Sequence, residues 1–464
     1  MKFNTINPAT AEILAEYEMA TPDDVKQAVE HAKKAFKEWS QLRPSERSKY
    51  LTKAAQILRD RKDEFARVMT NEMGKIIRES TAEVVKCALV FDFYAENAER
   101  FLTPEPAETD AAKTYVVFDP LGVIASIMPW NFPMWQLARF AAPAISAGNT
   151  TIFKPSSVTP QSGLNLQTAF REGGLPHGCF RTLLGDSRVA DLMIEAGTDA
   201  VTFTGSVPVG SKVGERAGKH LKKFVLELGG SDPFIVLADA DVEVASAGAV
   251  AGRFINCGQS CIAAKRFIVE RGVAENFIQK FVARTRKLKI GDPLSQDTDI
   301  GPLVRQSQVE EVEKQVNESV KIGAQALVGG ERLDRKGFYY APTVMTNVTP
   351  EMPVWREEVF GPVAPIMVVK DADEAIEAAN ASEFGLGASL WTSDLPRAER
   401  LCRMIQSGVV TVNNVVASDP RVPFGGVKKS GIGRELGKFG LLEFTNVKTI
   451  RVYEKYPVKV SPVE

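Results

Sequence analysis

The chain is poor in the residues that usually build metal centres and disulfide frameworks. Its 464 residues include only 3 histidines, scattered far from any acidic cluster: His31, His177 and His220. Zinc sites need such ligands close together, so we expect no metal. The 5 cysteines are too few for a disulfide framework in so long a chain. No histidine lies beside a cysteine in the sequence, so a reactive thiol is expected to use another base, unless the fold creates a Cys–His pair.

Charge excess and long apolar runs are also lacking. The 57 Lys and Arg residues nearly balance 58 Asp and Glu residues, which leaves no basic surface for nucleic acid or an anionic membrane. The apolar stretch 141–147 is short and broken by Pro143 and Gly148, so it is no membrane span. The first residues lack the design of a signal peptide. A composition of 44% hydrophobic and 25% charged residues predicts a globular, cytoplasmic protein without nucleic-acid or membrane partners.

The length and the hydrophobic pattern predict an α/β protein of two or three domains. Thr21 before Pro22 marks a helix start, and Pro44 opens a second helix, so the N-terminal region is expected to be largely helical. From about Gly122, short apolar runs alternate with helical stretches, which indicates a parallel sheet. The predicted strands are 122–128, 150–153, 180–184, 200–204, 224–226, 233–237, 266–269, 365–369 and 409–413. The alternating tail Val447–Val460 predicts a further strand, packed against a partner.

Three short segments carry a thiol, a carboxylate and an amide. Cys261 ends a Gly-Gln-Ser-Cys turn, on a loop predicted to follow a helix over 240–256. Glu227 stands in Leu-Glu-Leu-Gly-Gly, and Asn131 in Pro-Trp-Asn-Phe-Pro. Each has an ordinary explanation: a buried cysteine, a structural ion pair and a turn-forming asparagine. Together they suit covalent chemistry on a carbonyl, with a nucleophile, a base and an oxyanion donor.

The segment 202–212 predicts a strand, a glycine turn and a helix. A helix N-terminus offers free N–H groups that suit a pyrophosphate. The segment is not the dinucleotide fingerprint, and it fails as a P-loop because Ser211 stands where lysine should follow Gly210. The local pattern alone favours an ordinary strand-to-helix turn.

Taken jointly, these segments resemble the aldehyde dehydrogenase superfamily. The similarity extends from Asn7-Pro8-Ala9-Thr10 to the stretch 424–431 and takes in Phe153–Ser156, Phe203–Ser206, Glu357–Pro362 and Asn413. The resemblance implies an α/β fold with three parts. These are a Rossmann-type cofactor domain (1–101 and 121–230), an α/β catalytic domain (231–440) and a small β oligomerisation arm (102–120 and 441–464).

The family mechanism implied by the resemblance begins with attack of the Cys261 thiolate on an aldehyde. The side-chain amide of Asn131 and the backbone N–H of Cys261 would hold the oxyanion of the thiohemiacetal. Loss of hydride to a nicotinamide would leave a thioester, which water activated by Glu227 would hydrolyse.

The resemblance also implies a nicotinamide cofactor site. It places Glu358 on the nicotinamide ribose, Phe360 against the ring and Lys154 on the adenosine ribose. The remaining cofactor-site residues implied are Trp130, Gly205, Ser206 and Gly210. Ser157 stands where members that favour NAD commonly carry a glutamate, whose charge would repel a 2′-phosphate. We therefore expect NADP to be preferred, with NAD as a possible second acceptor.

For the substrate, the stretches 225–237 and 417–431 are most similar to short bacterial and archaeal succinate-semialdehyde dehydrogenases. Arg139 matches an arginine that binds the substrate carboxylate in that group. A second such arginine of some relatives is here Ile255, six residues before the cysteine. Candidate replacements for it are Arg253, Arg421 and the hydroxyl of Ser418. We expect succinate semialdehyde as substrate, with glyceraldehyde or a broad range of small aldehydes as alternatives.

Two functions of other kinds remain as alternatives. A noncatalytic binding protein of this fold would have no need of the intact Cys261, Glu227 and Asn131. An acylating enzyme, which passes the thioester to coenzyme A, would not need Glu227 for hydrolysis. Cys257 is more simply a packing residue than a redox partner of Cys261. Edge strands such as the tail need a partner, so a homodimer or homotetramer is expected.

Overall fold

A hairpin and four helices form the N-terminal part of the molecule. In the computed structural model, which describes residues 1–454, this part comprises β1 (Lys2–Asn7), β2 (Glu12–Glu18), α1 (Pro22–Trp39), α2 (Pro44–Asp60), α3 (Lys62–Met73) and α4 (Ile77–Phe101). As predicted, Thr21 caps α1, and it forms a reciprocal capping box with Asp24. Pro44 begins α2, also as predicted. The β1–β2 hairpin was not predicted, because its strands are mostly exposed and bury little apolar surface.

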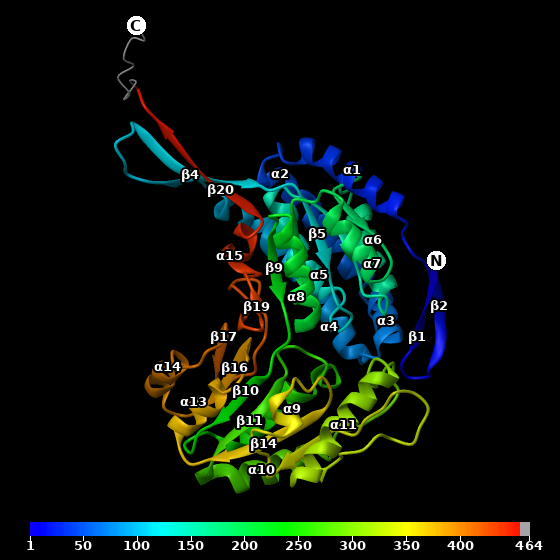
Figure 1. Cartoon of the computed structure of the whole chain (residues 1–464), viewed down its shortest axis with the longest axis vertical. Coiled ribbons are helices and arrows are strands. Elements are labelled where there is room, and N and C mark those ends of the chain that lie inside the picture. Colours follow the sequence, from blue (N-terminus) through cyan, green and yellow to red (C-terminus); the bar gives the residue numbers. More distant parts are fainter. Residues whose placement is uncertain (455–464) are drawn as a thin grey trace.

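A six-stranded sheet with the order β19-β9-β8-β5-β6-β7 forms the centre of the upper body in Figure 1. All its strands are parallel except the edge strand β19. Alternate residues of β5 face different apolar clusters, Ile124 on one side and Val123 and Ala125 on the other. The elements are β5 (Val123–Ile127), α5 (Trp135–Ala147), β6 (Thr150–Lys154), α6 (Pro160–Glu172), β7 (Phe180–Thr182), α7 (Ser187–Glu195), β8 (Ala200–Thr204), α8 (Val207–Lys219), β9 (Lys223–Glu227) and β19 (Gly431–Ile432).

A seven-stranded sheet with the order β12-β13-β14-β11-β10-β16-β17 forms the lower body. Only the β12–β13 pair is antiparallel. Its elements are β10 (Asp232–Val236), α9 (Val242–Phe254), the 3-10 turn η1 (Ile255–Gly258), β11 (Ala264–Glu270), α10 (Arg271–Thr285), α11 (Gln306–Ile322), β12 (Gln325–Val328), β13 (Thr343–Thr346), α12 (Pro353–Arg356), β14 (Val363–Val369), α13 (Ala372–Asn380), β16 (Gly387–Trp391), α14 (Leu395–Cys402) and β17 (Val409–Val412). The short strands β15 (Phe384–Gly385) and β18 (Val427–Lys428) pair beside it.

A narrow arm extends from the upper body (Figure 1). In it, β4 (Lys113–Pro120) pairs antiparallel with β20 (Thr445–Val452) along its whole length, and β3 (Glu105–Pro106) pairs with the other side of β4. The helix α15 (Gly437–Leu442) leads into β20. The predicted tail strand is therefore present as β20, which ends at Val452; residues 453 and 454 are not in a strand, and residues 455–460 of that prediction lie outside the described residues. The arm leaves both edges of a thin sheet exposed.

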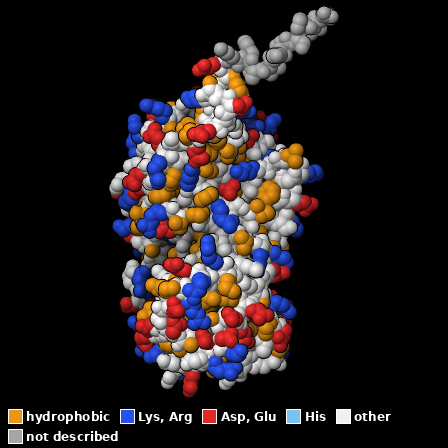
Figure 2. Space-filling model, turned by 90° about the vertical axis from the view of Figure 1, so that its left-hand side faces the viewer, with side chains coloured by type: hydrophobic (Ala, Val, Ile, Leu, Met, Phe, Trp, Pro, Cys, Tyr) orange, Lys and Arg blue, Asp and Glu red, His pale blue; other side chains and the backbone are white. Residues whose placement is uncertain are grey.

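The nine strands predicted in the α/β region are all present, as β5 to β11, β14 and β17. The chain passes from the first sheet to the second between Glu227, the last residue of β9, and Asp232, the first of β10. This crossing lies between the two bodies of the molecule (Figure 1). On the face shown in Figure 2, acidic and basic side chains are interspersed. Within residues 1–454, no helix is both long and apolar enough to cross a membrane.

Candidate active site

Cys261 follows three consecutive residues in the left-handed region of backbone space. In η1, Asn256, Cys257 and Gly258 have φ angles of 51°, 55° and 75°. Such angles are uncommon for residues with a side chain, and they need support from the surroundings. The side-chain amide of Asn256 supplies it by donating to the backbone carbonyl of Asn131 at 2.8 Å. The predicted position of Cys261, on a loop after a helix, is confirmed, and the turn ties this loop to the Asn131 segment.

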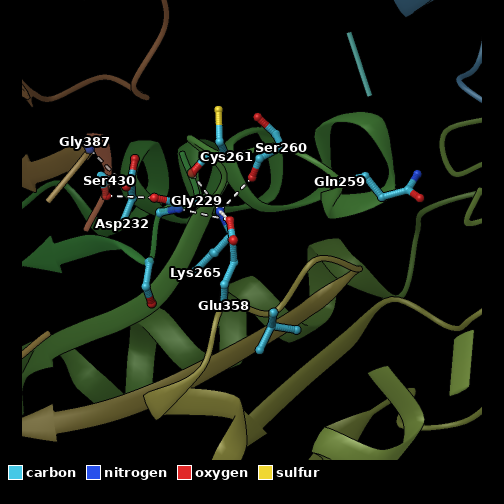
Figure 3. A network of polar contacts seen from close by, with 12 residues as sticks. Gly229, Asp232, Gln259, Ser260, Cys261, Lys265, Glu358, Gly387 and Ser430 are labelled. Atoms are coloured by element: carbon cyan, nitrogen blue, oxygen red, sulfur yellow. Dashed lines mark hydrogen bonds and ion pairs between the residues drawn. The ribbon is translucent and has the colours of Figure 1, made fainter. Parts of the chain in front are cut away.

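A buried lysine, Lys265, fixes the cysteine loop from below (Figure 3). Its ammonium donates to the carbonyl oxygens of Ser260 and Cys261, each at 2.7 Å. It also forms an ion pair with Glu358, whose Oε1 lies 3.2 Å from Nζ. The same carboxylate oxygen accepts from the backbone N–H of Gly230 at 3.0 Å. One cation therefore joins the cysteine loop, the Glu227 motif and the Glu358 motif.

The Asn131 side chain is buried and held in one orientation. Its Oδ1 accepts from Gln136 Nε2 at 3.1 Å, and its Nδ2 donates to the backbone carbonyl of Gln259 at 3.1 Å. An amide nitrogen carries two N–H groups, so one donor is left for an oxygen in the cavity that Asn131 lines together with Cys261. The geometry suits the predicted oxyanion donor.

Glu227 is a buried carboxylate without a hydrogen bond. Glu227 is the last residue of β9, and neither of its carboxylate oxygens has a hydrogen-bond partner among the described residues. Burial raises the pKa of Glu227 well above its ordinary range, and the negative charge of Glu435 raises it further, whereas Arg139 opposes the shift. Gly425 lies so close that a Cβ there would meet Glu227 Oε1 at 2.7 Å. Glu227 therefore does not form the structural ion pair that was one explanation for it. It is a buried acid with a raised pKa, as expected of a catalytic base.

Cys261 lies between two cavities. The larger, of about 390 Å³, is lined by Cys261 and by residues from both bodies, among them Trp130, Gly205, Glu358 and Phe360. The smaller, of about 210 Å³, is lined mainly by apolar side chains. Gln136 lines both cavities as well. A thiol at this junction is accessible from two sides.

Five of the residues predicted for cofactor binding meet in the larger cavity: Trp130, Gly205, Ser206, Glu358 and Phe360. The ring of Trp130 stands edge-on to that of Phe360, with centroids 5.7 Å apart. Ser206 precedes α8, and its side chain makes no cap hydrogen bond, so the first N–H groups of this 13-residue helix are open to a ligand. The predicted strand, turn and helix over 202–212 are confirmed.

Three predicted cofactor residues lie outside the lining of that cavity: Lys154, Ser157 and Gly210. Lys154 ends β6, and its buried ammonium donates to Pro155 O at 3.0 Å, while burial lowers its pKa to about 8. Ser157 is exposed on the following turn. A Cβ at Gly210 would meet Leu228 Cδ2 at 2.3 Å, so this glycine allows α8 to pack closely on the sheet.

On the other side of the thiol, Arg139, Ser418 and Ile255 line the smaller cavity. Arg139 is buried and ion-paired with Glu435, and its guanidinium lies 5.0 Å from the centroid of the Phe424 ring. Arg139, which was predicted to bind the substrate carboxylate, is therefore already paired with a carboxylate of the protein, Glu435. Ile255 is 40% exposed and leaves the position of the second arginine without a charge.

Neither arginine named as a replacement reaches the smaller cavity. The guanidinium of Arg253 is fully buried and donates to the carbonyl oxygens of Ala264, Val359 and Gly361. Arg421 is exposed and pairs with Asp419, two residues before it. The donors of Arg253 are used by backbone carbonyls, and Arg421 is exposed to solvent. Neither arginine therefore lines the smaller cavity.

Four polar residues of the site were missed by sequence reasoning: Lys86, Gln136, Lys265 and Glu435. Lys86, on α4, lines the smaller cavity and donates to Ser418 Oγ at 2.8 Å. Glu435 carries the charge that perturbs Glu227. The sequence gives a signal only for Lys265, a lysine directly before the predicted strand 266–269.

The cysteines are all free, and residues 1–454 hold no cluster of three or more His, Cys, Asp or Glu side chains that could bind a metal. Cys257 is buried in the apolar cluster of the second sheet, and burial raises its pKa. Cys261 instead packs at the margin of the cluster that covers the first sheet. The two thiols thus face different surroundings, which favours packing as the role of Cys257.

Comparisons with known proteins agree along the whole chain. The profile of the aldehyde dehydrogenase family matches residues 1–450. A probable NADP(+) succinate-semialdehyde dehydrogenase of Synechocystis sp. is 47% identical over 97% of this chain and 99% of its own length. The NADP(+) succinate-semialdehyde dehydrogenase 1 of Mycobacterium bovis is 46% identical over 97% and 99%. The solved succinic semialdehyde dehydrogenase of Streptococcus pyogenes, in complex with NADP+, superposes with a TM-score of 0.95 at 35% identity, over 97% of this chain and 100% of that one. The fold class expected from the sequence is confirmed.

Proposed function

The chain belongs to the aldehyde dehydrogenase family, and we propose that it oxidises succinate semialdehyde to succinate, with NADP as the preferred hydride acceptor. The observation that carries this proposal is the Cys261 thiol at the junction of two cavities. The larger cavity has groups that suit a nucleotide, and the smaller has a buried arginine and a half-buried lysine that suit a substrate carboxylate. The names of the similar proteins agree with this substrate and this cofactor.

The residues of the larger cavity fit a dinucleotide. The open N-terminus of α8 offers N–H groups to a pyrophosphate. Glu358 is held by Lys265 in a position to accept from ribose hydroxyls. Lys154 is a buried ammonium whose hydrogen-bond partner is a carbonyl, so it retains donors for the adenosine ribose or its phosphate. The exposed hydroxyl of Ser157 adds no negative charge there, which favours NADP over NAD.

In the proposed reaction, Cys261 loses its proton and attacks the aldehyde carbon. Burial raises the pKa of this thiol to about 11, and the charges of Arg139 and Lys265 oppose the shift. The oxyanion that forms is stabilised by Asn131 Nδ2 and the backbone N–H of Cys261. This tetrahedral oxyanion expels hydride far more readily than a free aldehyde does, and bound NADP supplies the acceptor.

Glu227 is proposed as the base that activates water against the thioester. It is not among the residues that line either cavity, whereas its neighbours Leu228 and Gly229 are. The carboxylate therefore has to turn toward Cys261 when it acts. Burial raises the pKa of Glu227, so the ionised carboxylate accepts a proton more readily than an exposed one does.

We propose a homodimer or homotetramer in the cytoplasm, divided into domains at the boundaries expected from the resemblance. The arm supports assembly, since β20 exposes Val447 (60%) and Val452 (46%) on an extended edge. Five free cysteines support a reducing compartment.

A broader aldehyde specificity is the second candidate, because Ile255 replaces one arginine and Arg139 is paired with Glu435. A panel of succinate semialdehyde, glyceraldehyde and butanal, each with NADP and NAD, decides between the two. We expect the highest kcat/KM for succinate semialdehyde with NADP, and the free acid as product even when coenzyme A is added. Equal values for butanal and succinate semialdehyde would favour the broad enzyme, and acyl-CoA would reveal an acylating one. No turnover of any aldehyde, with Cys261 unreactive to iodoacetamide, would favour the binding protein.

The substitution Arg139→Ala tests the predicted substrate arginine. Because Arg139 also balances Glu435 beside Glu227, we expect a lower kcat for every aldehyde. A carboxylate-binding role adds a rise in KM that is much larger for succinate semialdehyde than for butanal. If the substitution changes only kcat, and by the same factor for succinate semialdehyde and butanal, then Arg139 serves to pair with Glu435 and does not bind the substrate carboxylate.

A further inference from the structure

The substrate-side cavity holds a second cation, Lys86, which comes from α4 in the N-terminal part of the chain. Its ammonium lies 4.1 Å from the centroid of the Trp135 ring and donates to Ser418 Oγ at 2.8 Å. Lys86, Trp135 and Ser418 line the same cavity as Cys261. The fold thus brings an ammonium to the cavity in which Ile255 leaves the position of an arginine uncharged.

The charge of Lys86 has no carboxylate in contact with it. Within residues 1–454 the ion pairs do not include Lys86, and the nearest acids are engaged elsewhere. Glu83, on the same helix, is paired with Lys75 and accepts from two backbone N–H groups at the start of α5, each at 3.0 Å. Asp419 is paired with Arg421. Glu83 and Asp419 act on Lys86 only from a distance, so Lys86 keeps donors and a charge without a contacting carboxylate for an anion in the cavity.

Arg139, the other cation of this cavity, makes the binding of such an anion more favourable. Burial, together with the charge of Arg139, lowers the pKa of Lys86 to about 8. Two cations that disfavour each other are stabilised by an anion placed near both. Because Arg139 already faces Glu435, Lys86 has the larger unbalanced charge.

Ser418 completes the site. Its oxygen accepts from Lys86, so its own O–H remains free to donate. Apolar side chains such as Ile262 and Val415 form the other walls. The cavity therefore combines an apolar channel from the thiol with a polar end made of an ammonium and a hydroxyl.

We propose that Lys86, together with Ser418, binds the carboxylate of a short semialdehyde and takes the place of the arginine that is absent at Ile255. This inference rests on the proposed function, and it makes Lys86 a residue that determines substrate specificity. It contributes binding to the carboxylate end and takes no part in the proton or hydride steps.

The kinetic test compares succinate semialdehyde with butanal, which has the same chain length but no carboxylate. We expect Lys86→Met to lower kcat/KM for succinate semialdehyde about 10- to 100-fold through KM, because a hydrogen-bonded charge pair is lost. For butanal we expect a change of about threefold or less, because its alkyl end makes no charged contact. Lys86→Arg keeps the charge and should retain most of the preference. Arg100→Met removes an exposed cation from the same helix and serves as the control.

The pH profile of the unmodified enzyme gives a second test. The ratio of the two kcat/KM values cancels the ionisation of Cys261 and Glu227, which both substrates share. It should fall as pH rises above about 8, because Lys86 then loses its proton, and Lys86→Arg should remove that fall. Other groups near Lys86 are Glu79, Glu83, Cys87, Arg139 and Asp419. Of these, Glu79 has its pKa raised to about 7 by burial, so any fall due to Glu79 lies at lower pH and persists in Lys86→Arg.

The outcomes separate this inference from the proposed function. A wild-type enzyme that oxidises butanal but shows no preference for succinate semialdehyde overturns both. A wild type with that preference, whose Lys86→Met variant loses both substrates equally, overturns the role of Lys86 alone. If Lys86→Met does not fold, the pH profile decides, since a ratio that stays flat above pH 8 also overturns it.

Discussion

The exchange of Glu227 for glutamine separates the hydrolytic step from the steps before it. Glutamine has nearly the same shape but accepts no proton, so thioester hydrolysis should slow by the 10²- to 10⁴-fold that a general base contributes (~3–5 kcal/mol). Attack by Cys261 and hydride transfer do not need Glu227 in the proposed reaction. Rapid mixing of Glu227→Gln with aldehyde and NADP should therefore give a burst of about one reduced cofactor per subunit, followed by very slow turnover. A variant that turns over at the wild-type rate, or that gives no burst, would refute the assigned role.

The same exchange should also stabilise the fold, because the buried carboxylate costs free energy. Glu227 has an ordinary pKa of 4.5 and a pKa well above that value in the fold. The folded protein then holds a proton that the unfolded chain loses above pH 4.5, so stability falls as pH rises toward the folded pKa. At pH 7 this penalty reaches at most about 3 kcal/mol. Glutamine is uncharged and so does not have this electrostatic penalty. The exchange also breaks no hydrogen bond, because the Glu227 carboxylate makes none.

Urea unfolding at pH 5 and pH 7 measures this effect. We expect Glu227→Gln to be more stable than wild type at pH 7, with the gain shrinking toward pH 5. Glu435→Gln gives a contrast of opposite sign, because it removes the ion-pair partner of Arg139 and should destabilise by about 3–5 kcal/mol, although it also removes a charge that raises the pKa of Glu227. An equal gain for Glu227→Gln at both pH values, or a loss, would contradict the electrostatic explanation.

The remaining predictions concern the cofactor, the oxyanion and the thiol. Ser157→Glu should lower kcat/KM for NADP about 10- to 100-fold and leave NAD little changed, because a carboxylate repels the 2′-phosphate; unchanged NADP kinetics would remove Ser157 from the argument. Asn131→Ala should slow the hydride burst about 10²- to 10³-fold with little effect on KM, and a normal burst would exclude the amide as an oxyanion donor. In the cofactor-free protein, alkylation of Cys261 by iodoacetamide should accelerate about tenfold per pH unit from pH 7 to pH 10, because its pKa is about 11. A plateau already at pH 8 would show a more acidic thiol.

The elements near the site were predictable where the signal is local. Strands buried on both faces, such as β5, β6 and β8, have uninterrupted apolar sequences. Thr21 and Pro44 mark helix starts through capping chemistry. By contrast, β16 was missed because Gly-Ala-Ser-Leu-Trp has little strand propensity, although its pairing with β10 and β17 buries every residue. The formation of β16 therefore depends on its tertiary contacts and not on its local sequence.

The direction of a side chain was not predictable from its distance to a motif. Arg253 lies two residues before Ile255, which made it a candidate for the same position. Arg253 lies inside α9, whereas Ile255 lies just beyond the last residue of that helix with φ −50° and ψ 132°, so the chain changes direction between the two side chains. Arg253 is accordingly buried and bound to three backbone carbonyls, whereas Ile255 lines the substrate-side cavity.

Under the proposed function, the charges around Cys261 make Arg139 alone a weak ligand for a substrate carboxylate. Arg139 faces Glu435, and its charge also opposes the raised pKa of Glu227. A cation that neutralises one carboxylate contributes less to a second one, since each added anion is also repelled by the first. The anion of the substrate thus needs a cation that the base and its neighbour do not use. Of the cations near Cys261 in the sequence, Lys265 is paired with Glu358 and Arg253 is bound to backbone carbonyls, whereas α4 is separated from the cysteine by the strands β5 to β9. Only folding brings Lys86 to Ser418, so the specificity of this site is a property of the tertiary structure.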